Sequence, residues 1–575
     1  MASRLTTLIV ASIVVATLIA GIIARAQRDD DGPVDLIVYN GKVYAAGGSA
    51  TFAEAIAVRG NTIFRVGTNR EIKRMRRPQT TVVDAHGGAV IPGFNDAHVH
   101  FLDGSLGFSE PNLLDATTVE EIGERIRAYA DTRPEQPWVR GRGWLYTAFA
   151  GGLPTRQQLD AIVPDRPAYL IAYDGHSGWA NTAALKAAGI TRATPNPPNG
   201  IVVKDASGEP TGVLKEAAMD LMRRVLPAPE HAEQLAALRA GIHEAHRLGV
   251  TSVQNADATA EELALWDELR ETHDLSIRVY NAVSAGPDLT EAGADALEPI
   301  RRQYADDPLL KAGAIELMAD GVIETHTAAM LEPYANKPTT GISNFTPEAL
   351  TRIVTMLDAR GWQVWIHAIG DRAVRMSLDA FEAAAKINPA PPRGRRHRIE
   401  HIEAIDPADI PRFGRLGVIA SMQPFHANPD PGLGTVWSAN LGPERAARGW
   451  MWQSIAAAGG RLAFGSDWPV VPLDPRPGLQ VAVNRLSSDS EPHGGWIPSE
   501  RLRLTGAIDA YTSGAAYASF DEQRKGTLAR GMLADIVILT ADIFDAPPER
   551  VLDAHVAVTI FDGKVVYDRS TAATE

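Results

Sequence analysis

Eight short apolar segments, each typical of a buried strand, alternate with helical patterns through most of the chain. They are AVIPGFNDAH, GVTSVQNAD, LSIRVYNAV, GAIELMADG, WQVWIHAIGD, HRIEHIEAI, GVIASMQP and RLAFGSDWP. Regular alternation of strand and helix indicates a parallel β/α architecture. Eight strands are the number that a closed, TIM-like (β/α)8 barrel requires, although an open doubly wound sheet can also be large. We therefore predict an α/β fold built around such a barrel.

The rest of the chain predicts two further units. Residues 106–239, between the first two strand candidates, carry strand and turn signals of their own and indicate an inserted subdomain beside the barrel. Segments 35–47 and 556–568 are alternating apolar runs interrupted by Asn-Gly or Asp-Gly, which suit a two-residue hairpin turn. We predict two hairpins that meet in one small β-sandwich domain. Two unrelated hairpins are the alternative. The predicted boundaries are 34–89 and 526–570 for the small domain, and 90–105 and 240–525 for the barrel.

The first residues predict export. Leu5–Ala24 is a run of 20 residues without a charge, long enough to cross a bilayer as a helix. Ala24-Arg25-Ala26 has the small-x-small pattern that signal peptidase reads. We predict that residues 1–33 are a signal peptide or a membrane anchor, followed by a linker, and that the rest is periplasmic or extracellular. A cytosolic protein is the remaining alternative.

The composition limits which classes of partner the protein can bind and which residue types can bind a metal. A net charge of −14 argues against nucleic acid as the main partner, because a phosphate-binding surface needs concentrated Lys and Arg. The chain has no cysteine, which excludes disulfides and thiolate ligands, so any metal must be held by His and carboxylates. We expect a small-molecule substrate and allow for a homodimer. The membrane is a partner only if the N-terminal segment is retained.

Imidazole and carboxylate side chains recur where the predicted strands end, the place where a barrel builds its active site. Five of the 15 histidines fall at or just beyond these ends. His98 and His100 are two residues apart in an extended strand and therefore face the same side. The candidate residues are His98, His100, Glu316, Asp320, His367, His401, His426 and Asp467.

These residue types together predict a metal centre. A single histidine at a strand end is more often a hydrogen-bonded structural residue, but the joint pattern favours shared ligation. Imidazole and carboxylate ligands suit Zn2+, with Mn2+ or Fe2+ as alternatives. Such an ion lowers the pKa of its water from about 15.7 towards about 7. A carboxylate such as Asp467 could then accept the proton and pass it to a leaving amine.

The chain also resembles a known family. IPGFNDAHVH, WIHAIGD, RIEH, GSDWPV and the C-terminal GTLARGMLADIVIL and TIFDGKVVY are similar to motifs of the amidohydrolase superfamily. DGHSGWANTAAL and ADGVIETHTAAM resemble its branch of N-substituted formamide deformylase-like, or YtcJ-like, hydrolases. The resemblance runs from about residue 35 to residue 568. It implies a barrel enzyme that uses one or two divalent metal ions.

The resemblance also implies roles for single residues. His98, His100, His367 and His401 match its metal histidines, and Asp467 matches the aspartate that binds metal and acts as general base. Many members have Lys on the fourth strand, where this chain has Glu316. A glutamate could bridge two metals directly. The alternative is that Glu316 lies beside a single metal without binding it.

Further residues are predicted to line the pocket. His176 and His426 are catalytic candidates, and His326 and His426, which lie past strand ends, could hold a carbonyl oxygen as it becomes an oxyanion. Asp174, Trp179, Asp320 and His326 are candidate substrate-binding residues. Trp179 is about as well explained as a core residue.

We therefore expect a metal-dependent hydrolase that cleaves a C–N bond in a small N-formyl amine, N-acyl amine or cyclic amide. An esterase, lactonase or phosphoesterase would suit the same site. A catalytically inactive, membrane-tethered binding protein is the non-enzymatic alternative, and the complete ligand set argues against it.

Overall fold

The computed structural model describes residues 33–48, 51–429, 431–487, 489 and 491–572. Eight strands form one parallel sheet in chain order, from β8 at one edge to β20 at the other. The predicted barrel architecture is confirmed. The strands are β8 (Phe94–Val99), β14 (Val250–Ala258), β15 (Arg278–Ala285), β16 (Leu310–Met318), β17 (Gln363–Ala368), β18 (Arg398–His401), β19 (Ile419–Met422) and β20 (Arg461–Phe464).

Backbone hydrogen bonds join the first and last strands of this sheet. The N–H of Asp467 donates to the carbonyl of His98 over 2.7 Å, and the N–H of His100 donates to the carbonyl of Trp468 over 2.7 Å. Gly465 permits this approach, because a Cβ there would lie 2.5 Å from the backbone nitrogen of His98. The join places the two predicted ligand segments, at the start and end of the barrel, side by side.

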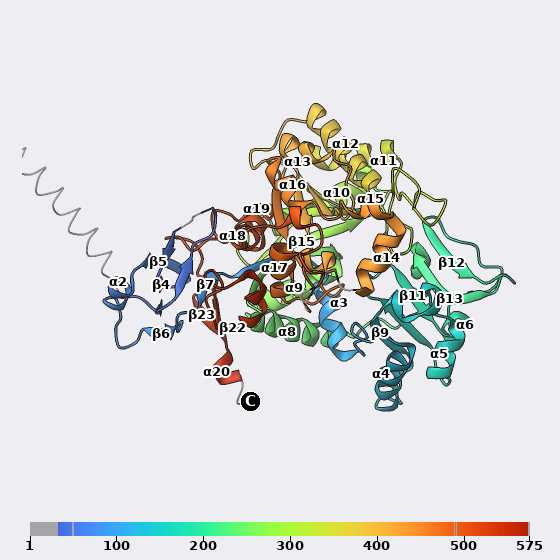
Figure 1. Cartoon of the computed structure of the whole chain (residues 1–575), viewed down its shortest axis with the longest axis horizontal. Helices are drawn as coiled ribbons and strands as arrows, with labels where there is room; N and C mark the ends of the chain where they lie inside the picture. The colour runs from blue at the N-terminus through green and yellow to red at the C-terminus, as the bar shows by residue number, and fades with distance from the viewer. Residues whose placement is uncertain (1–32, 49–50, 430, 488, 490, 573–575) are drawn as a thin grey trace, which may run out of the picture.

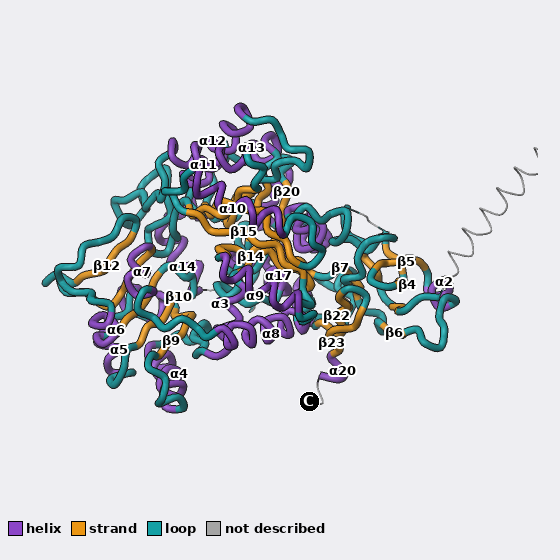
Figure 2. Tube along the Cα trace, turned by 180° about the vertical axis from the view of Figure 1, so that it is seen from behind, coloured by secondary structure: helices purple, strands orange, loops and turns teal. Residues whose placement is uncertain are grey.

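Helices cover the outside of the barrel (Figure 2). Threonines begin several of them, because their side-chain oxygens accept the backbone N–H groups that the first turn leaves unpaired. Thr259, Thr290 and Thr346 serve α9, α10 and α11 in this way. The helices are α8 (His231–Arg247), α9 (Ala260–Glu271), α10 (Glu291–Gln303), α11 (Pro347–Ala359), α12 (Asp371–Ile387), α13 (Ile410–Leu416), α16 (Trp452–Ala457), α17 (Pro475–Asn484), α18 (Leu504–Asp509) and α19 (Ala515–Ala518).

A five-stranded sheet lies between β8 and β14 in the sequence and beside the barrel in space (Figure 1). Its order is β12 (Gly200–Lys204), β13 (Pro210–Glu216), β11 (Ser177–Ala180), β10 (Ala168–Ala172) and β9 (Val139–Trp144). Helices α4 (Val119–Asp131), α5 (Arg156–Ile162), α6 (Thr182–Ala187) and α7 (Asp220–Arg223) belong to the same stretch of chain. The turn between β10 and β11 carries Asp174 and His176 to the barrel.

Two smaller sheets lie on the opposite side of the barrel (Figure 1). Apolar residues from both, including Val38 and Ile536, share one core cluster. One sheet has the order β5 (Thr62–Gly67), β4 (Ala55–Arg59), β1 (Leu36–Tyr39) and β6 (Thr81–Asp84). The other has the order β23 (Lys564–Asp568), β22 (Val556–Phe561), β21 (Ile536–Leu539), β7 (Ala89–Pro92), β2 (Lys42–Tyr44) and β3 (Phe52–Ala53), so it combines strands from both ends of the chain.

The hairpin predicted over residues 35–47 is wrong. Strand β1 pairs with β4 and β6, whereas β2 pairs with β3 and β7 in the other sheet. Asn40 takes a left-handed φ of 58° and the chain crosses between sheets there. At the other end, β22 and β23 do form an antiparallel pair around Asp562-Gly563. An Asn-Gly or Asp-Gly dipeptide therefore occurs in this chain both at a crossing between two sheets and in a hairpin turn.

The predicted first strand, residues 89–98, is two strands. Gly93 separates β7, in the six-stranded sheet, from β8, in the barrel. The chain passes close to β14 at this point, because a Cβ on Gly93 would lie 2.2 Å from Thr251 Oγ1. A continuous apolar run did not reveal that its two halves belong to different sheets.

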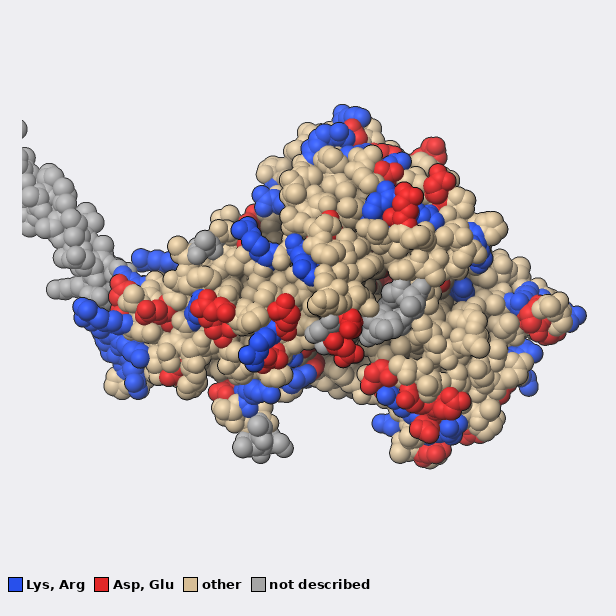
Figure 3. Space-filling view, viewed as in Figure 1, with Lys and Arg blue, Asp and Glu red and all other residues tan. Residues whose placement is uncertain are grey.

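Charged side chains are spread over the face seen in Figure 3. Basic residues gather by α2 (Asn69–Lys73), where Lys73, Arg74, Arg76 and Arg77 are exposed. Acidic residues gather over α4. Among the described residues, no helix is both long and apolar enough to span a bilayer. The predicted export segment, Leu5–Ala24, lies outside the described residues.

Candidate active site

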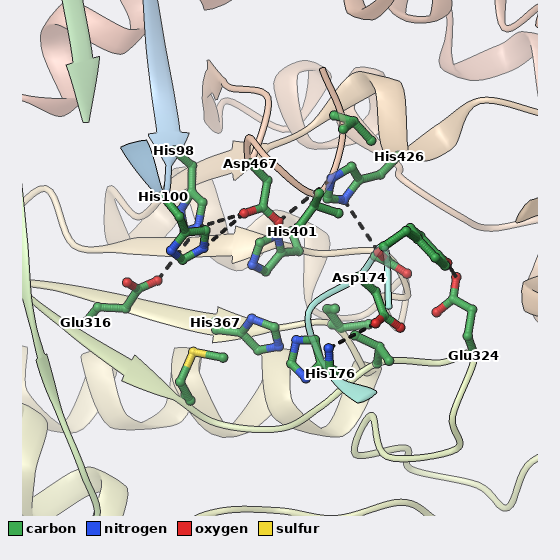
Figure 4. Close-up of a pocket in the computed structure, with 17 residues that line it drawn as sticks. His98, His100, Asp174, His176, Glu316, Glu324, His367, His401, His426 and Asp467 are labelled. Atoms are coloured by element: carbon green, nitrogen blue, oxygen red, sulfur yellow. Dashed lines mark hydrogen bonds and ion pairs between the residues drawn. The ribbon is translucent and has the colours of Figure 1, made fainter. Parts of the chain in front are cut away.

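A pocket lies at the carboxyl ends of the barrel strands, as predicted. Figure 4 shows the labelled histidines and Asp467 between Glu316 at one end and Glu324 at the other. Its apolar lining is Met318, Val322, Ile369, Val470 and Val471. Its polar lining is His98, His100, Tyr173, Asp174, His176, Glu316, Glu324, His367, His401, Glu403, His426 and Asp467.

Three predicted ligands form the tightest group. One ligand atom from each of His98, His401 and Asp467 lies within 4.8 Å of the other two, and all three side chains are buried. His98 Nε2 is 3.6 Å from Asp467 Oδ1. His401 and Asp467 have left-handed φ values of 71° and 62°, a region that non-glycine residues rarely adopt and that recurs at functional sites. This trio is the centre of the candidate metal site.

The electrostatics of the trio suit a cation. Burial opposes ionisation of Asp467, but His100, whose Nε2 is 3.2 Å from Oδ1, and the other neighbouring histidines hold its pKa well below the ordinary value. Burial lowers the pKa of His401 well below its usual range. At neutral pH Asp467 and His401 therefore offer a carboxylate and a neutral imidazole, the forms that bind metal. Burial works to lower the pKa of His98, but the hydrogen bond and charge of Glu400 raise it.

Hydrogen bonds at Nδ1 hold two of the candidate ligand histidines in place. His98 Nδ1 lies 3.0 Å from Glu400 Oε2, and His401 Nδ1 lies 2.9 Å from Gln423 Oε1. Glu400 is fully buried, and its two oxygens accept hydrogen bonds from Nε and Nη2 of Arg398. A carboxylate or amide oxygen at Nδ1 keeps the proton there and leaves Nε2 to bind a metal.

His100 and Glu316 lie next to the trio. His100 Nε2 is 3.2 Å from Asp467 Oδ1. Glu316 Oε1 is 3.9 Å from His98 Nε2, while Oε2 accepts the backbone N–H of Asp257 over 2.6 Å. Burial raises the pKa of Glu316 to about 6. One oxygen of Glu316 is thus held by the backbone and the other faces the histidines.

His367 has a buried nitrogen without a hydrogen bond. Its ring centroid is 4.5 Å from that of His401, and its Nε2 makes no hydrogen bond with any described residue, although Asp320 Oδ1 is 3.6 Å away. Burial lowers the pKa of His367 to about 3. Leaving such an atom unpaired costs free energy, which a bound metal would recover. The donor set and this orphaned atom fit a first-row divalent ion.

His176 comes from the inserted segment and approaches the histidines of the barrel. Its ring centroid is 5.4 Å from that of His367, and its Nδ1 lies 2.8 Å from Glu216 Oε2. Burial works to lower the pKa of His176, but the charge and hydrogen bond of Glu216 raise it to about 9. The imidazole is therefore protonated at neutral pH and can donate to an oxygen in the pocket.

His426 lies between the trio and a second group of carboxylates. Its Nε2 is 3.8 Å from Asp467 Oδ2, and its Nδ1 is 3.9 Å from Glu403 Oε1. The Nε2 atom has no hydrogen-bond partner among the described residues, and the side chain is 10% exposed. A ligand in the pocket could supply the missing partner.

Two predicted substrate-binding residues lie elsewhere. The Trp179 indole is fully buried in the core of the inserted segment, where its Nε1 donates to the carbonyl of Thr155 and its ring packs on Phe149. His326 Nε2 is 2.9 Å from Asn336 Oδ1 and its ring packs on Tyr334. Neither side chain belongs to the lining of this pocket.

Asp320, also predicted to bind substrate, instead forms hydrogen bonds with the backbone. Its carboxylate accepts the N–H groups of Ala329, Ile369 and Gly370. These bonds connect the loop after β16 to the end of β17, which carries His367. The side chain is buried, and burial raises its pKa to about 7.

Sequence reasoning missed several polar residues around the site. Glu400 alternates with Arg398 on a strand whose four residues are all buried, and two charged residues on such a strand were an available signal. Gln423 follows β19 directly. Glu324 and Glu403 stand in loops without a periodic pattern, so nothing local distinguished them from surface residues.

The comparisons with known proteins agree with this geometry. The model of the amidohydrolase family matches residues 81–567. The chain belongs to the amidohydrolase family. The chain is 33% identical to "Protein LONG AFTER FAR-RED 3" of Arabidopsis thaliana, covering 93% of this chain and 91% of that protein. It is 30% identical to "Putative amidohydrolase YtcJ" of Bacillus subtilis (strain 168), with coverages of 93% and 99%.

Two further comparisons concern activity and fold. The chain is 26% identical to "N-substituted formamide deformylase" of Arthrobacter pascens, covering 93% of this chain and 99% of that protein. An uncharacterized metal-dependent hydrolase from Pyrococcus horikoshii OT3 superposes with a TM-score of 0.71 at 25% identity, covering 89% of this chain and 99% of the other. Family and fold thus support a hydrolase with a metal site at the barrel mouth.

Proposed function

We propose that this amidohydrolase cleaves a C–N bond of a small amide-like substrate with the help of a divalent metal ion, most naturally Zn2+. The observation that carries the proposal is the convergence of His98, His401 and Asp467 within 4.8 Å, in a pocket that also contains His367. The similarity to a deformylase of N-substituted formamides supports a C–N substrate. Ligand type favours Zn2+, with Mn2+ or Fe2+ as alternatives.

The six predicted metal ligands of the pocket each have a role in this proposal. His98, His401 and Asp467 would hold the ion, with His100, His367 and Glu316 as further ligands. A bound divalent ion supplies Lewis acidity, which activates water and polarises a carbonyl. The Asp467 carboxylate would accept a proton from the attacking water and deliver it to the leaving nitrogen.

The rest of the pocket would orient the substrate. The protonated His176 would donate a hydrogen bond to the carbonyl oxygen as its negative charge develops, and His426 Nε2 would serve as a second donor. The apolar side chains of Val470 and Val471 would exclude water from the reacting carbonyl. Residues of the inserted segment and of the barrel thus act on one substrate.

Metal content and hydrolysis test the proposal together. Protein stripped with a chelator and reloaded with Zn2+ is expected to hold stoichiometric metal and to hydrolyse members of a panel of N-formyl and N-acyl amines. His98→Ala should lose the metal, measured by elemental mass spectrometry, and lower kcat/KM on the order of 1,000-fold or more. His231→Ala, an exposed histidine on α8, is the matched control and should retain both properties.

Matched esters, lactones and phosphoesters in the same panel separate amide from ester chemistry. Turnover of esters alone would replace the C–N proposal with an esterase. Protein that takes up no metal and hydrolyses no member of the panel would overturn the hydrolytic proposal and leave a binding protein as the alternative.

A further inference from the structure

Three carboxylates converge at the end of the pocket farthest from Glu316. Asp174 comes from the turn after β10, Glu324 from the loop after β16, and Glu403 from the segment after β18. Asp174 and Glu403 are 8% and 6% exposed, and Glu324 is half-buried. Figure 4 shows Asp174 and Glu324 on this side, beyond His176 and His426. Three separate segments of the chain thus bring negative charge to one place.

The hydrogen-bond donors to these carboxylates are neutral. The Tyr146 hydroxyl donates to Asp174 Oδ2 over 2.8 Å, and the Tyr173 hydroxyl donates to Glu324 Oε1 over 3.1 Å. Trp437 Nε1 donates to Glu403 Oε2 over 2.8 Å, and the backbone N–H of His176 donates to Asp174 Oδ1. These contacts fix the carboxylates without neutralising them.

No Lys or Arg of the described chain forms an ion pair with the group, although the protonated imidazole of His176 places one positive charge near Asp174. Within the ranges that the structure describes, neither Lys nor Arg lies within 4.0 Å of the three carboxylates. The only ion-pair contact found there is that of Glu403 with His426, at 3.9 Å. Burying charge without a partner is expensive, so a buried anionic group in a pocket favours a ligand of opposite charge. Burial raises the pKa of all three groups, that of Glu324 to about 7, that of Asp174 above its ordinary value and that of Glu403 well above it. Their ionised forms lack a matching partner charge, which a bound cation would supply.

A second observation points to a ligand in the same space. The ring of His426 lies between Asp467 and Glu403: its Nε2 is 3.8 Å from Asp467 Oδ2 and its Nδ1 is 3.9 Å from Glu403 Oε1. The Nε2 atom is buried and makes no hydrogen bond with a described residue, so it needs a partner in the pocket, such as the carbonyl oxygen of a substrate. The pocket wall near it is apolar, with Val470 and Val471. A fitting ligand places its carbonyl by His426, its alkyl chain on the valines and a cation at the carboxylates.

We propose that Asp174, Glu324 and Glu403 form a subsite for a cationic group of the substrate, an alkylammonium or guanidinium. The inference rests on the proposed function and narrows it, because the substrate then becomes an amide of a molecule that carries a second, protonated amine. One imidazole ring, that of His426, separates the cationic subsite from Asp467. A short alkyl chain between the scissile amide and the amine matches that spacing.

Binding of a simple cation tests the subsite without any reaction. Pentylammonium and 1-pentanol have nearly the same shape, and at pH 7 the ammonium has no lone pair to offer a metal, since its pKa lies near that of lysine, about 10.4. Calorimetry on the Zn2+-loaded protein should give binding of pentylammonium on the order of 10- to 100-fold tighter than that of 1-pentanol. Equal affinity for the two molecules would overturn the proposal.

Variants identify the residues responsible. Glu324→Gln and Glu403→Gln keep the size of the side chain and remove its charge, so each should reduce the preference for pentylammonium on the order of 10-fold. Asp220→Asn is the matched control, because Asp220 lies outside this pocket and pairs with Arg223. A preference that survives in both glutamine variants would contradict the assignment. If a glutamine variant does not fold, the comparison of the two probes on the unaltered protein still decides the matter.

Hydrolysis separates this inference from the proposed function. N-Formyl-1,4-diaminobutane carries an ammonium where N-pentylformamide carries a methyl group. The proposal expects kcat/KM to be on the order of 10- to 100-fold higher for the cationic formamide, and expects Glu324→Gln to reduce that ratio more than it reduces turnover of the neutral one. If neither is hydrolysed while pentylammonium binds selectively, these formamides fail as substrates and the subsite stands. If both are hydrolysed equally, the subsite fails and the function stands.

Discussion

At the scale of single residues, the hydrogen bond at Nδ1 of a candidate ligand histidine decides which of its two nitrogens is free to bind a metal. Gln423 is fully buried, and its Oε1 lies 2.9 Å from His401 Nδ1. Its Nε2 has no partner among the described residues, so the side chain gains little from its amide nitrogen. The side chain therefore acts through its oxygen, which fixes His401, and Gln423 is a positioning residue for that histidine.

Replacing Gln423 should change metal affinity more than stability. Gln423→Met keeps the volume and removes the acceptor, so the dissociation constant for Zn2+ should rise about 10- to 100-fold in a chelator competition. Gln423→Glu restores an acceptor and should recover the affinity. Gln480→Met, another buried glutamine, is the control. An unchanged Zn2+ affinity in Gln423→Met would show that the bond does not position His401.

At the scale of elements, a neutral histidine joins three neighbours in the barrel wall. His397, just before β18, accepts the backbone N–H of Val364 on β17 at Nδ1, over 3.0 Å. Its Nε2 lies 3.1 Å from Asp358 Oδ1 on α11, and its ring stacks on Phe381 of α12. Because Nδ1 must accept, the native arrangement requires the neutral imidazole. Burial accordingly lowers the pKa of His397.

This contact predicts a loss of stability in mild acid. The folded pKa of His397 lies below the unfolded value of about 6.5, so the unfolded state takes up the proton first as the pH falls. The contribution of His397 to the free energy of unfolding is complete above pH 6.5. Below that pH it declines by up to about 1.4 kcal/mol per pH unit. The pKa of Asp358 is also lowered, and its own contribution is lost only in stronger acid, below about pH 4.

A variant isolates the histidine from the other titrating groups. His397→Asn keeps an acceptor near the position of Nδ1 and does not titrate. Urea unfolding at pH 7 and pH 5 should show a smaller loss of stability in the variant than in the unaltered chain. The same pH dependence in both proteins would assign the effect to other groups.

At the scale of the whole molecule, a buried ion pair joins the barrel to the six-stranded sheet. Arg278 on β15 binds both oxygens of Asp535, which precedes β21, and one oxygen of Asp562 in the turn before β23. Arg278 and Asp535 are 4% and 5% exposed. The two partners are 257 positions apart in the chain, so this contact forms only when both units are folded and docked.

Breaking the pair should destabilise the whole protein. Arg278→Met leaves Asp535 buried without its cation, and the free energy of unfolding in urea should fall by about 3 to 5 kcal/mol. Arg360→Met removes a more exposed pair with Glu291 and Asp295, and should cost no more than about 1 kcal/mol. Equal effects of the two substitutions would indicate that the six-stranded sheet does not depend on Arg278.

The sequence by itself determined the barrel, its eight strands and the three residues of the candidate metal site. Strand and helix periods are local, and His98, His401 and Asp467 stand at strand ends that these periods locate. Periodicity states which face a residue occupies, but not which segment lies opposite. Only the tertiary structure could therefore assign β1 and β2 to different sheets, divide the first strand at Gly93, and place Trp179 in a core.

The tertiary structure also decided the surroundings of the site. Gln423 and Glu400 matter because each reaches a histidine on another strand, and such contacts leave no regular spacing in the sequence. Asp174, Glu324 and Glu403 come from loops whose conformations depend on the whole fold. The residue types that bind a metal can thus be read along the chain, whereas the charge of the space in front of them depends on how distant loops meet.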